Sequence, residues 1–257
     1  MRAWAWACAL LALLGSAAVA EPLPDGRRSG LEFMGESTQA MQRDDALNPG
    51  MLWVLEGEAV WSQPVGADGR SCAGCHGAAR QAMRGVAARY PAFDTALQRP
   101  IDLRQRIASC RQKLQPQAIT PGDAPQALAL EAYVAFQSRG LPITPPADPR
   151  LEPARDRGRR LFHQRLGQLD LACSDCHEAH AGRRLGGSPI PQAHPTGYPI
   201  YRLEWQGLGS LQRRLRACLS GVRAEPFAWG AAEWIELELY LAWRARGMPL
   251  ESPAVRP

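Results

Sequence analysis

The pentapeptides Cys72-Ala-Gly-Cys-His76 and Cys173-Ser-Asp-Cys-His177 decide how this chain folds. Both have the pattern C-x-x-C-H, which is the attachment signal for c-type haem. Two thiols on one helical turn reach the two vinyl groups of one porphyrin, and the following histidine lies under the iron as its proximal ligand. A zinc site or a thioredoxin-like pair would explain the paired cysteines but not the paired histidines. We therefore predict two covalently bound haem c groups, held by Cys72, Cys75, His76, Cys173, Cys176 and His177.

The sequence around the first motif recurs around the second, which indicates an internal repeat. With the motifs in register, the matching pairs are Gly57 with Gly158, Tyr90-Pro91 with Tyr198-Pro199, Arg106-Ile-Ala-Ser-Cys110 with Arg214-Leu-Arg-Ala-Cys218, and Arg139-Gly-Leu-Pro142 with Arg246-Gly-Met-Pro249. A proline-rich linker at 142–149 separates the repeats, because a helix cannot continue through it. We expect an N-terminal extension at 21–50, a first domain at 51–145 and a second, catalytic domain at 146–257.

Each repeat has the order helix, haem motif, long loop and last helix. The first helix carries a glycine that suits a close helix crossing, and the last helices are predicted at 127–138 and 231–246. Strand-like alternation is nearly absent. The order resembles class I cytochrome c, so the predicted fold is mainly α, with two class I cytochrome c-like domains in tandem and one haem in each.

The position opposite the proximal histidine differs from that of a usual class I cytochrome. Neither repeat has a methionine at the usual place before its last helix: Met83 follows His76 by only seven residues, which is too close to swing round the ring, and Met248 lies beyond the last helix, where packing is the expected role. Cys110 and Cys218 stand there instead, and three alternatives remain open for them: thiolate ligation of each haem, inert buried thiols, or a Cys110–Cys218 disulfide. His163, His180 and His194 are expected at the surface, the last two being alternative ligands of the second haem.

Arg106 and Arg214 each precede a distal cysteine by four residues. On a helix, residues i and i+4 share a face, so each guanidinium would lie beside a sulfur. There it would favour the thiolate and could hold an anion. The alternative is a salt bridge to a haem propionate. Arg223 is a further basic candidate near Cys218.

The first twenty residues predict export. Arg2, an apolar run at 4–14 and the small-x-small sequence Ala18-Val-Ala20 form a secretory signal peptide at 1–20, which places the mature chain in the oxidising periplasm. No other apolar run is long enough to span a membrane. The net charge of +5 comes from 30 basic and 25 acidic residues spread along the chain, so no nucleic-acid stripe is present.

The chain resembles the SoxA family, the dihaem cytochrome subunits of the SoxAX complex in sulfur-oxidising bacteria. The resemblance covers nearly the whole mature chain, and it is strongest at Asn48-Pro-Gly-Met-Leu-Trp53, Ser71-Cys-Ala-Gly-Cys-His-Gly77, Gly197-Tyr-Pro-Ile-Tyr-Arg-Leu-Glu-Trp205, Gly209-Ser-Leu-Gln-Arg-Arg-Leu-Arg-Ala-Cys218, Gly221-Val-Arg-Ala-Glu-Pro226 and Leu237-Glu-Leu-Tyr-Leu-Ala242. The ending Arg246-Gly-Met248, followed by Pro253-Ala-Val-Arg256, also fits the family.

The resemblance implies an activity, L-cysteine S-thiosulfotransferase. Thiosulfate is joined oxidatively to a cysteine of a SoxYZ-like carrier protein, and two electrons pass to cytochrome c. It also implies a SoxX-like monohaem partner in a heterodimer. Cys218 would be both iron ligand and catalytic sulfur, able to carry a persulfide, with Arg214 in the same site. The haem of His76 and Cys110 would be the remoter one.

Two other functions fit the same motifs. A dihaem thiosulfate dehydrogenase also uses a cysteine ligand but forms tetrathionate without a carrier. A non-catalytic dihaem electron shuttle would have the same fold, and only the two distal cysteines argue against it. The requirement for a carrier protein, and the effect of replacing Cys218, separate these functions.

Overall fold

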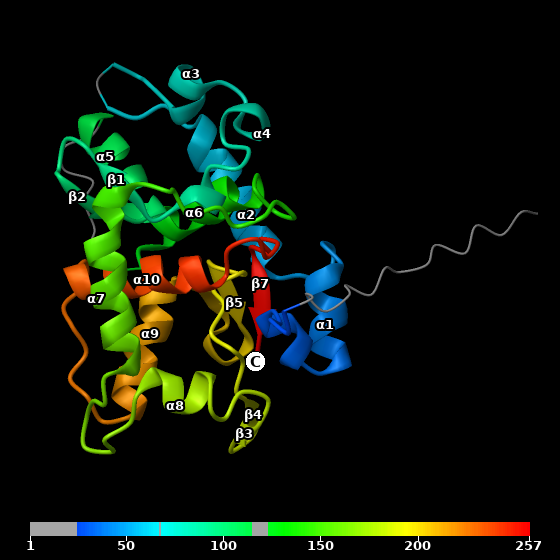
Figure 1. The fold of residues 1–257 in the computed structure, drawn as a ribbon. Helices are drawn as coiled ribbons and strands as arrows, with labels where there is room; N and C mark the ends of the chain where they lie inside the picture. Colours follow the sequence, from blue (N-terminus) through cyan, green and yellow to red (C-terminus); the bar gives the residue numbers. More distant parts are fainter. Residues whose placement is uncertain (1–24, 67, 115–122) are drawn as a thin grey trace, which may run out of the picture.

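We analysed a computed structural model, which describes residues 25–66, 68–114 and 123–257. The expected signal peptide lies outside these residues. No helix in the described part of the chain is long and apolar enough to cross a membrane. The chain forms two similar helical units, one at each end of the view in Figure 1, with a small sheet and the N-terminal segment beside the second unit.

The first unit is built from short helices around one hairpin. Its elements are α2 (Gly50–Ser62), α3 (Cys72–His76), α4 (Ala79–Ala82), a 3-10 helix (Ala87–Arg89), β1 (Ala92–Asp94), β2 (Arg99–Ile101), α5 (Leu103–Leu114) and α6 (Pro125–Phe136). The second unit follows a 3-10 helix (Pro149–Leu151) and has a similar order, except that an additional hairpin follows its haem motif where the first unit has α4 and a 3-10 helix. Its elements are α7 (Glu152–His163), α8 (Cys173–His177), β3 (Arg184–Leu185), β4 (Ser188–Pro189), β5 (Ile200–Arg202), a 3-10 helix (Leu203–Trp205), β6 (Gly207–Gly209), α9 (Leu211–Gly221) and α10 (Ala232–Arg244).

The segment predicted as a long loop contains regular structure in both units. Each has an antiparallel hairpin that leads into a helix, and these two hairpins have the same register: Ala92 pairs with Ile101, and Ile200 pairs with Gly209. The second unit has the additional hairpin of β3 and β4. The offset between the repeats is therefore 108 residues here, from Ala92 to Ile200. Strands of three residues are too short to show alternation in a sequence, so the pattern did not reveal them.

Glycines let the long helices of each unit cross closely. A Cβ atom at Gly57 in α2 would lie 2.1 Å from the carbonyl oxygen of Ala129 in α6. A Cβ atom at Gly158 in α7 would lie 1.9 Å from the carbonyl oxygen of Glu236 in α10. Real Cβ contacts are never so short, so each crossing requires glycine. This confirms the close crossing that the repeat predicted.

The N-terminal extension packs against a three-stranded sheet of the second unit. Strand β7 (Ala254–Arg256) runs parallel to β5, and β5 pairs with β6 on its other side. Helix α1 (Glu36–Arg43) lies against β7 (Figure 1), where the Oε1 atom of Gln42 accepts a hydrogen bond from the Val255 amide at 3.1 Å. Asn48 donates to the Pro253 carbonyl oxygen at 2.9 Å. The extension is thus part of the second unit's structure.

Apolar packing holds the two units together. Met248 is 1% exposed and lies in a cluster with Ala88 and Ile143 of the first repeat and Ala245 and Leu250 of the second. The packing role expected for Met248 is therefore confirmed. Larger clusters lie within the units, around Trp61 and Leu130 in the first and around Phe162 and Trp234 in the second.

Candidate haem sites

The second haem motif forms one helical turn, α8, which brings its three functional side chains together. Asp175 stabilises the start of this turn, because its Oδ2 atom accepts a hydrogen bond from the Ala172 amide at 2.9 Å. The Nδ1 atom of His177 lies 2.7 Å from the Pro191 carbonyl oxygen. A carbonyl oxygen only accepts, so Nδ1 must carry the proton and Nε2 is left free to bind iron. Burial lowers the pKa of His177, which favours the neutral ligand form.

His177, Cys218 and Arg214 line the same cleft. Cys218 and Arg214 lie on α9, and the walls include Tyr198, Leu211, Leu215 and Leu241. The cleft contains about 920 Å³ of empty space, part of it open to solvent. An imidazole with a free Nε2, a cysteine sulfur and mainly apolar walls fit a haem with His/Cys ligation. Cys173 and Cys176, on the turn that carries His177, are the residues that would attach it.

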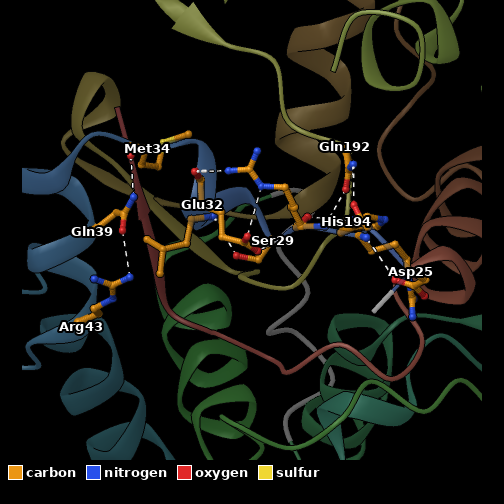
Figure 2. A network of polar contacts seen from close by, with 12 residues as sticks. Asp25, Ser29, Glu32, Met34, Gln39, Arg43, Gln192 and His194 are labelled. Atoms are coloured by element: carbon orange, nitrogen blue, oxygen red, sulfur yellow. Dashed lines mark hydrogen bonds and ion pairs between the residues drawn. The ribbon is translucent and has the colours of Figure 1, made fainter. Parts of the chain in front are cut away.

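The N-terminal extension closes one side of this cleft. Gly30 and Met34 are among its lining residues. Figure 2 shows the segment that begins at Asp25 beside Gln192 and His194. The Arg28 amide donates to Gln192 Oε1 at 2.7 Å, and His194 Nδ1 donates to the Arg28 carbonyl oxygen at 2.9 Å. His194 is therefore partly buried and lines the cleft rather than lying free at the surface. His163 and His180 are exposed, as expected.

Two further arginines in this cleft, one buried and one partly buried, were not singled out by the sequence. Arg202 on β5 and Arg256 on β7 are partners in the parallel register, and both line the cleft. Arg202 is only 9% exposed, and its Nε atom is buried without a hydrogen-bond partner among the described residues. Both residues stood in the motifs that resemble the family. Their proximity to Cys218 depends on strand pairing, which spacing along the chain does not show.

The first haem motif forms the equivalent turn, α3, but it is more exposed. Ser71 Oγ accepts a hydrogen bond from the Gly74 amide at 2.9 Å, which begins the turn. His76 is exposed, and its ring centroid lies 5.7 Å from that of Trp61. Cys110 on α5 is also exposed. Burial raises the pKa of the Cys72 thiol, and Cys110 is near enough to contribute in the same direction. The structure therefore places Cys110 on the side of the first motif.

All six cysteines in the described residues are free, so the Cys110–Cys218 disulfide is not formed. The two residues lie instead at equivalent positions of α5 and α9. Each helix also carries the arginine four residues earlier, Arg106 or Arg214, on the face expected for i and i+4. Arg223 lies just after α9 and is exposed, with a positive φ of 56°.

The two arginines differ in their contacts. Arg106 Nη2 lies 2.6 Å from Asp94 Oδ2, and its Nε donates to the Tyr90 hydroxyl at 3.2 Å. Within the described residues, Arg214 makes no ion pair and no side-chain hydrogen bond. The guanidinium beside Cys218 is thus available to an anion, whereas the one on α5 already contacts a carboxylate.

Comparison with known proteins agrees with this architecture. The family model described as the SoxA/TsdA cytochrome c domain matches the chain twice, over residues 56–143 and 157–250. The L-cysteine S-thiosulfotransferase subunit SoxA of Rhodovulum sulfidophilum is 36% identical over 232 residues, which are 90% of this chain and 81% of the relative. The chain belongs to the SoxA family. Its fold is accordingly that of two cytochrome c domains in tandem.

Other members of the SoxA family show the same extent of similarity. The SoxA subunit of Pseudaminobacter salicylatoxidans is 36% identical over 89% of this chain and 80% of its own length. The crystal structure of SoxXA from P. pantotrophus superimposes with a TM-score of 0.86 at 30% identity, covering 90% of this chain and 87% of that one. The similarity therefore covers most of both units.

Proposed function

We propose that this chain is the dihaem subunit of a periplasmic L-cysteine S-thiosulfotransferase that conjugates thiosulfate to a cysteine of a SoxYZ-like carrier protein. The observation that carries the proposal is the cleft of the second unit, where His177 and Cys218 lie together with Arg214, whose side chain has no acidic partner among the described residues. The names of the SoxA relatives support the reaction, and the superposition on SoxXA supports a SoxX-like monohaem partner.

The reaction joins two nucleophilic sulfurs. A carrier thiol and thiosulfate form one S–S bond, and one proton and two electrons are released: RSH + S₂O₃²⁻ → RS–S₂O₃⁻ + H⁺ + 2e⁻. The bound haems supply the one-electron path by which the two electrons reach a cytochrome c acceptor. Both sulfur substrates are anionic when they react, so a site that brings them together needs fixed positive charge.

Cys218 and Arg214 supply the chemistry of the chain itself. The Cys218 sulfur is a soft group that can form a transient S–S bond and then be displaced, including as a persulfide. The Arg214 guanidinium stays protonated and presents a planar set of donors to the thiosulfate oxygens. His177 and Cys218 are proposed as ligands of the second haem, and His76 and Cys110 as ligands of the first.

Export and cofactor content are proposed together, with cleavage after Ala20 and two covalent haems on the mature chain. The intact mass of the exported protein measures both. A denatured mass that corresponds to one haem, or to none, would contradict the assignment of the two motifs. Additional mass of one sulfur would indicate the persulfide.

The activity is tested by conjugation of thiosulfate to the purified carrier, measured from the carrier's mass. Cys218→Ser should abolish conjugation while two haems are retained. The matched variant Cys110→Ser should retain measurable conjugation, because it changes the remoter site. Formation of tetrathionate without any carrier would assign the chain to the thiosulfate dehydrogenases instead. Turnover of Cys218→Met equal to that of wild type would indicate an electron shuttle.

A further inference from the structure

At one equivalent position, the hairpins of the two repeats carry residues of opposite charge, an aspartate in the first and an arginine in the second. Asp94 ends β1 and pairs with Arg99, and Arg202 ends β5 and pairs with Gly207. The registers are identical, so the two residues correspond at the offset of 108 residues that also relates Arg106 to Arg214 and Cys110 to Cys218. The charge next to the distal cysteine helix is therefore reversed between the units.

In the first unit this position neutralises the helix arginine. The Asp94 carboxylate lies 2.6 Å from Arg106 Nη2, and Asp94 is buried. Hydrogen bonds from the amides of Ala96 and Leu97, both at 2.8 Å, fix the Asp94 carboxylate, so it cannot turn away. These backbone hydrogen bonds, together with Arg106, lower the pKa of Asp94. An anion at Arg106 would have to displace or approach a fixed negative charge.

In the second unit the same position adds positive charge. Arg202 and Arg214 line one cleft with Cys218, and Arg256 lies beside Arg202 in the strand register. Arg202 contacts Glu204 at 2.7 Å, and the Glu204 side chain is half exposed. Arg256 is held by Gln42 at 2.5 Å and lies 3.8 Å from Glu251. Among the described residues, Arg202, Arg214 and Arg256 line the cleft, whereas Glu204 and Glu251 contact two of these arginines without lining it.

We propose that the residue at this hairpin position, Asp94 in the first unit and Arg202 in the second, determines which of the two Arg–Cys pairs binds a small oxyanion. Arg202 is then a specificity-determining residue for the substrate anion at Cys218. The proposal deepens the proposed function, because it assumes that thiosulfate is taken up beside Cys218. It also explains why two helices with the same Arg and Cys spacing need not have the same reactivity.

The burial of Arg202 supports an anion as its missing partner. Its Nε atom is buried and has no partner in the part of the chain that the structure describes, and a buried unpaired donor costs free energy until an acceptor reaches it. Burial lowers the pKa of Arg202, and repulsion from Arg214 acts in the same direction. A dianion between the two guanidiniums would relieve both the repulsion and the missing hydrogen bond. A haem carboxylate has the same chemistry, so the experiment must separate it from thiosulfate.

The experiment measures thiosulfate binding to the oxidised dihaem protein, without carrier, by isothermal titration calorimetry. Wild type should bind one thiosulfate. Arg202→Asp, which copies the first unit, should bind it about ten- to a hundredfold more weakly. Arg202→Lys should recover most of the affinity, because it restores the charge. Asp94→Asn keeps the oxygen that the Ala96 and Leu97 amides contact but removes the charge, so it should create a second, weaker site that is lost again on Arg106→Ala.

Several outcomes would overturn the inference. One is equal thiosulfate affinity in Arg202→Asp and wild type with two haems present in each. Another is a single binding site in Asp94→Asn. A third is a change in the potential of the second haem in Arg202→Asp with no change in thiosulfate affinity, because Arg202 would then serve only a haem carboxylate. If the wild-type protein binds thiosulfate but does not modify the carrier, the proposed function is contradicted and the inference about Arg202 is not.

Discussion

Arg106 and Arg214 occupy the same helix position but differ in what neutralises them. Asp94 holds Arg106, whereas Arg214 faces the cleft without an acidic partner among the described residues. Charge-assisted hydrogen bonds contribute roughly 1.5–3 kcal/mol. Arg214→Ala should therefore lower turnover in the carrier assay by about one to two orders of magnitude, with both haems retained. Arg106→Ala should change turnover much less. Equal losses of turnover in Arg214→Ala and Arg106→Ala would show that the second unit is not the only catalytic site.

Ligation by the distal cysteines is also tested at single residues. We expect both ferric haems to be low-spin with His/Cys ligation, because Cys110 and Cys218 lie at equivalent positions of α5 and α9. Electron paramagnetic resonance of the oxidised protein measures this. Cys218→Ser should remove the His/Cys signal of one haem and leave the other. His/His or His/Met signatures for both haems would contradict the assignment, with His194 the first residue to examine because it lines the second cleft.

At the scale of elements, the helix crossings depend on glycine. Gly158→Ala would place a Cβ atom 1.9 Å from the Glu236 carbonyl oxygen, and this oxygen belongs to the backbone of α10. Helix α7 would have to move away from α10, and overpacking of this kind costs about 1–3 kcal/mol or more. We expect a lower midpoint of denaturant unfolding. Gly221→Ala, at the end of α9 with nothing within 4 Å, is the matched control and should be neutral or slightly stabilising. Equal midpoints for the two variants would exclude a tight crossing.

At the scale of the whole molecule, a buried polar cluster lies between the two units. Asp102 accepts a hydrogen bond from Gln212 at 2.9 Å, and Asp123 contacts both Arg104 and Ser210 at 2.6 Å. Glu131 and Glu238 line the same cavity, together with residues of both repeats. The Glu131 Oε2 atom is buried without a partner in the described part of the chain. Carboxyl groups thus outnumber guanidiniums in this cavity.

This cluster predicts a pH dependence of stability. Burial raises the pKa of Glu131 from 4.5 to about 7, so the folded protein holds a proton that the unfolded chain releases above pH 4.5. Stability should therefore fall as pH rises from about 4.5 to 7 and then level off, with a total loss on the order of 3 kcal/mol from this group. The free energy of unfolding at pH 5 and at pH 8 measures it.

Glu131→Gln tests that pH dependence directly. The variant cannot ionise, so the difference between its stabilities at the two pH values should be smaller than in wild type. Burial raises the pKa of Glu238 in the same direction, so a residual slope should remain until Glu238→Gln is added. An unchanged slope in the double variant would show that these carboxyl groups are not the cause.

Local sequence patterns determined the haem motifs, the repeat and the helix crossings. The C-x-x-C-H spacing needs only one helical turn, and the Arg106–Cys110 and Arg214–Cys218 pairs need only the i, i+4 geometry of a helix. Gly57 and Gly158 were informative because a close crossing excludes any Cβ atom. The haem motifs and the Arg–Cys pairs depend on residues a few positions apart, which is the range over which backbone geometry fixes side-chain positions.

Only the tertiary structure decided how the two sites differ. The pairing of Asp94 with Arg106, the position of Arg202 beside Arg214, and the contact of the N-terminal extension with His194 join residues that local periodicity cannot connect. The three-residue strands that carry Asp94, Arg202 and Arg256 are too short to show a pattern. Folding also decides whether each arginine is neutralised, because this depends on the charged groups that are packed against it. The sequence thus contained two similar haem-binding motifs, and long-range packing gave the arginine and cysteine beside each motif different surroundings.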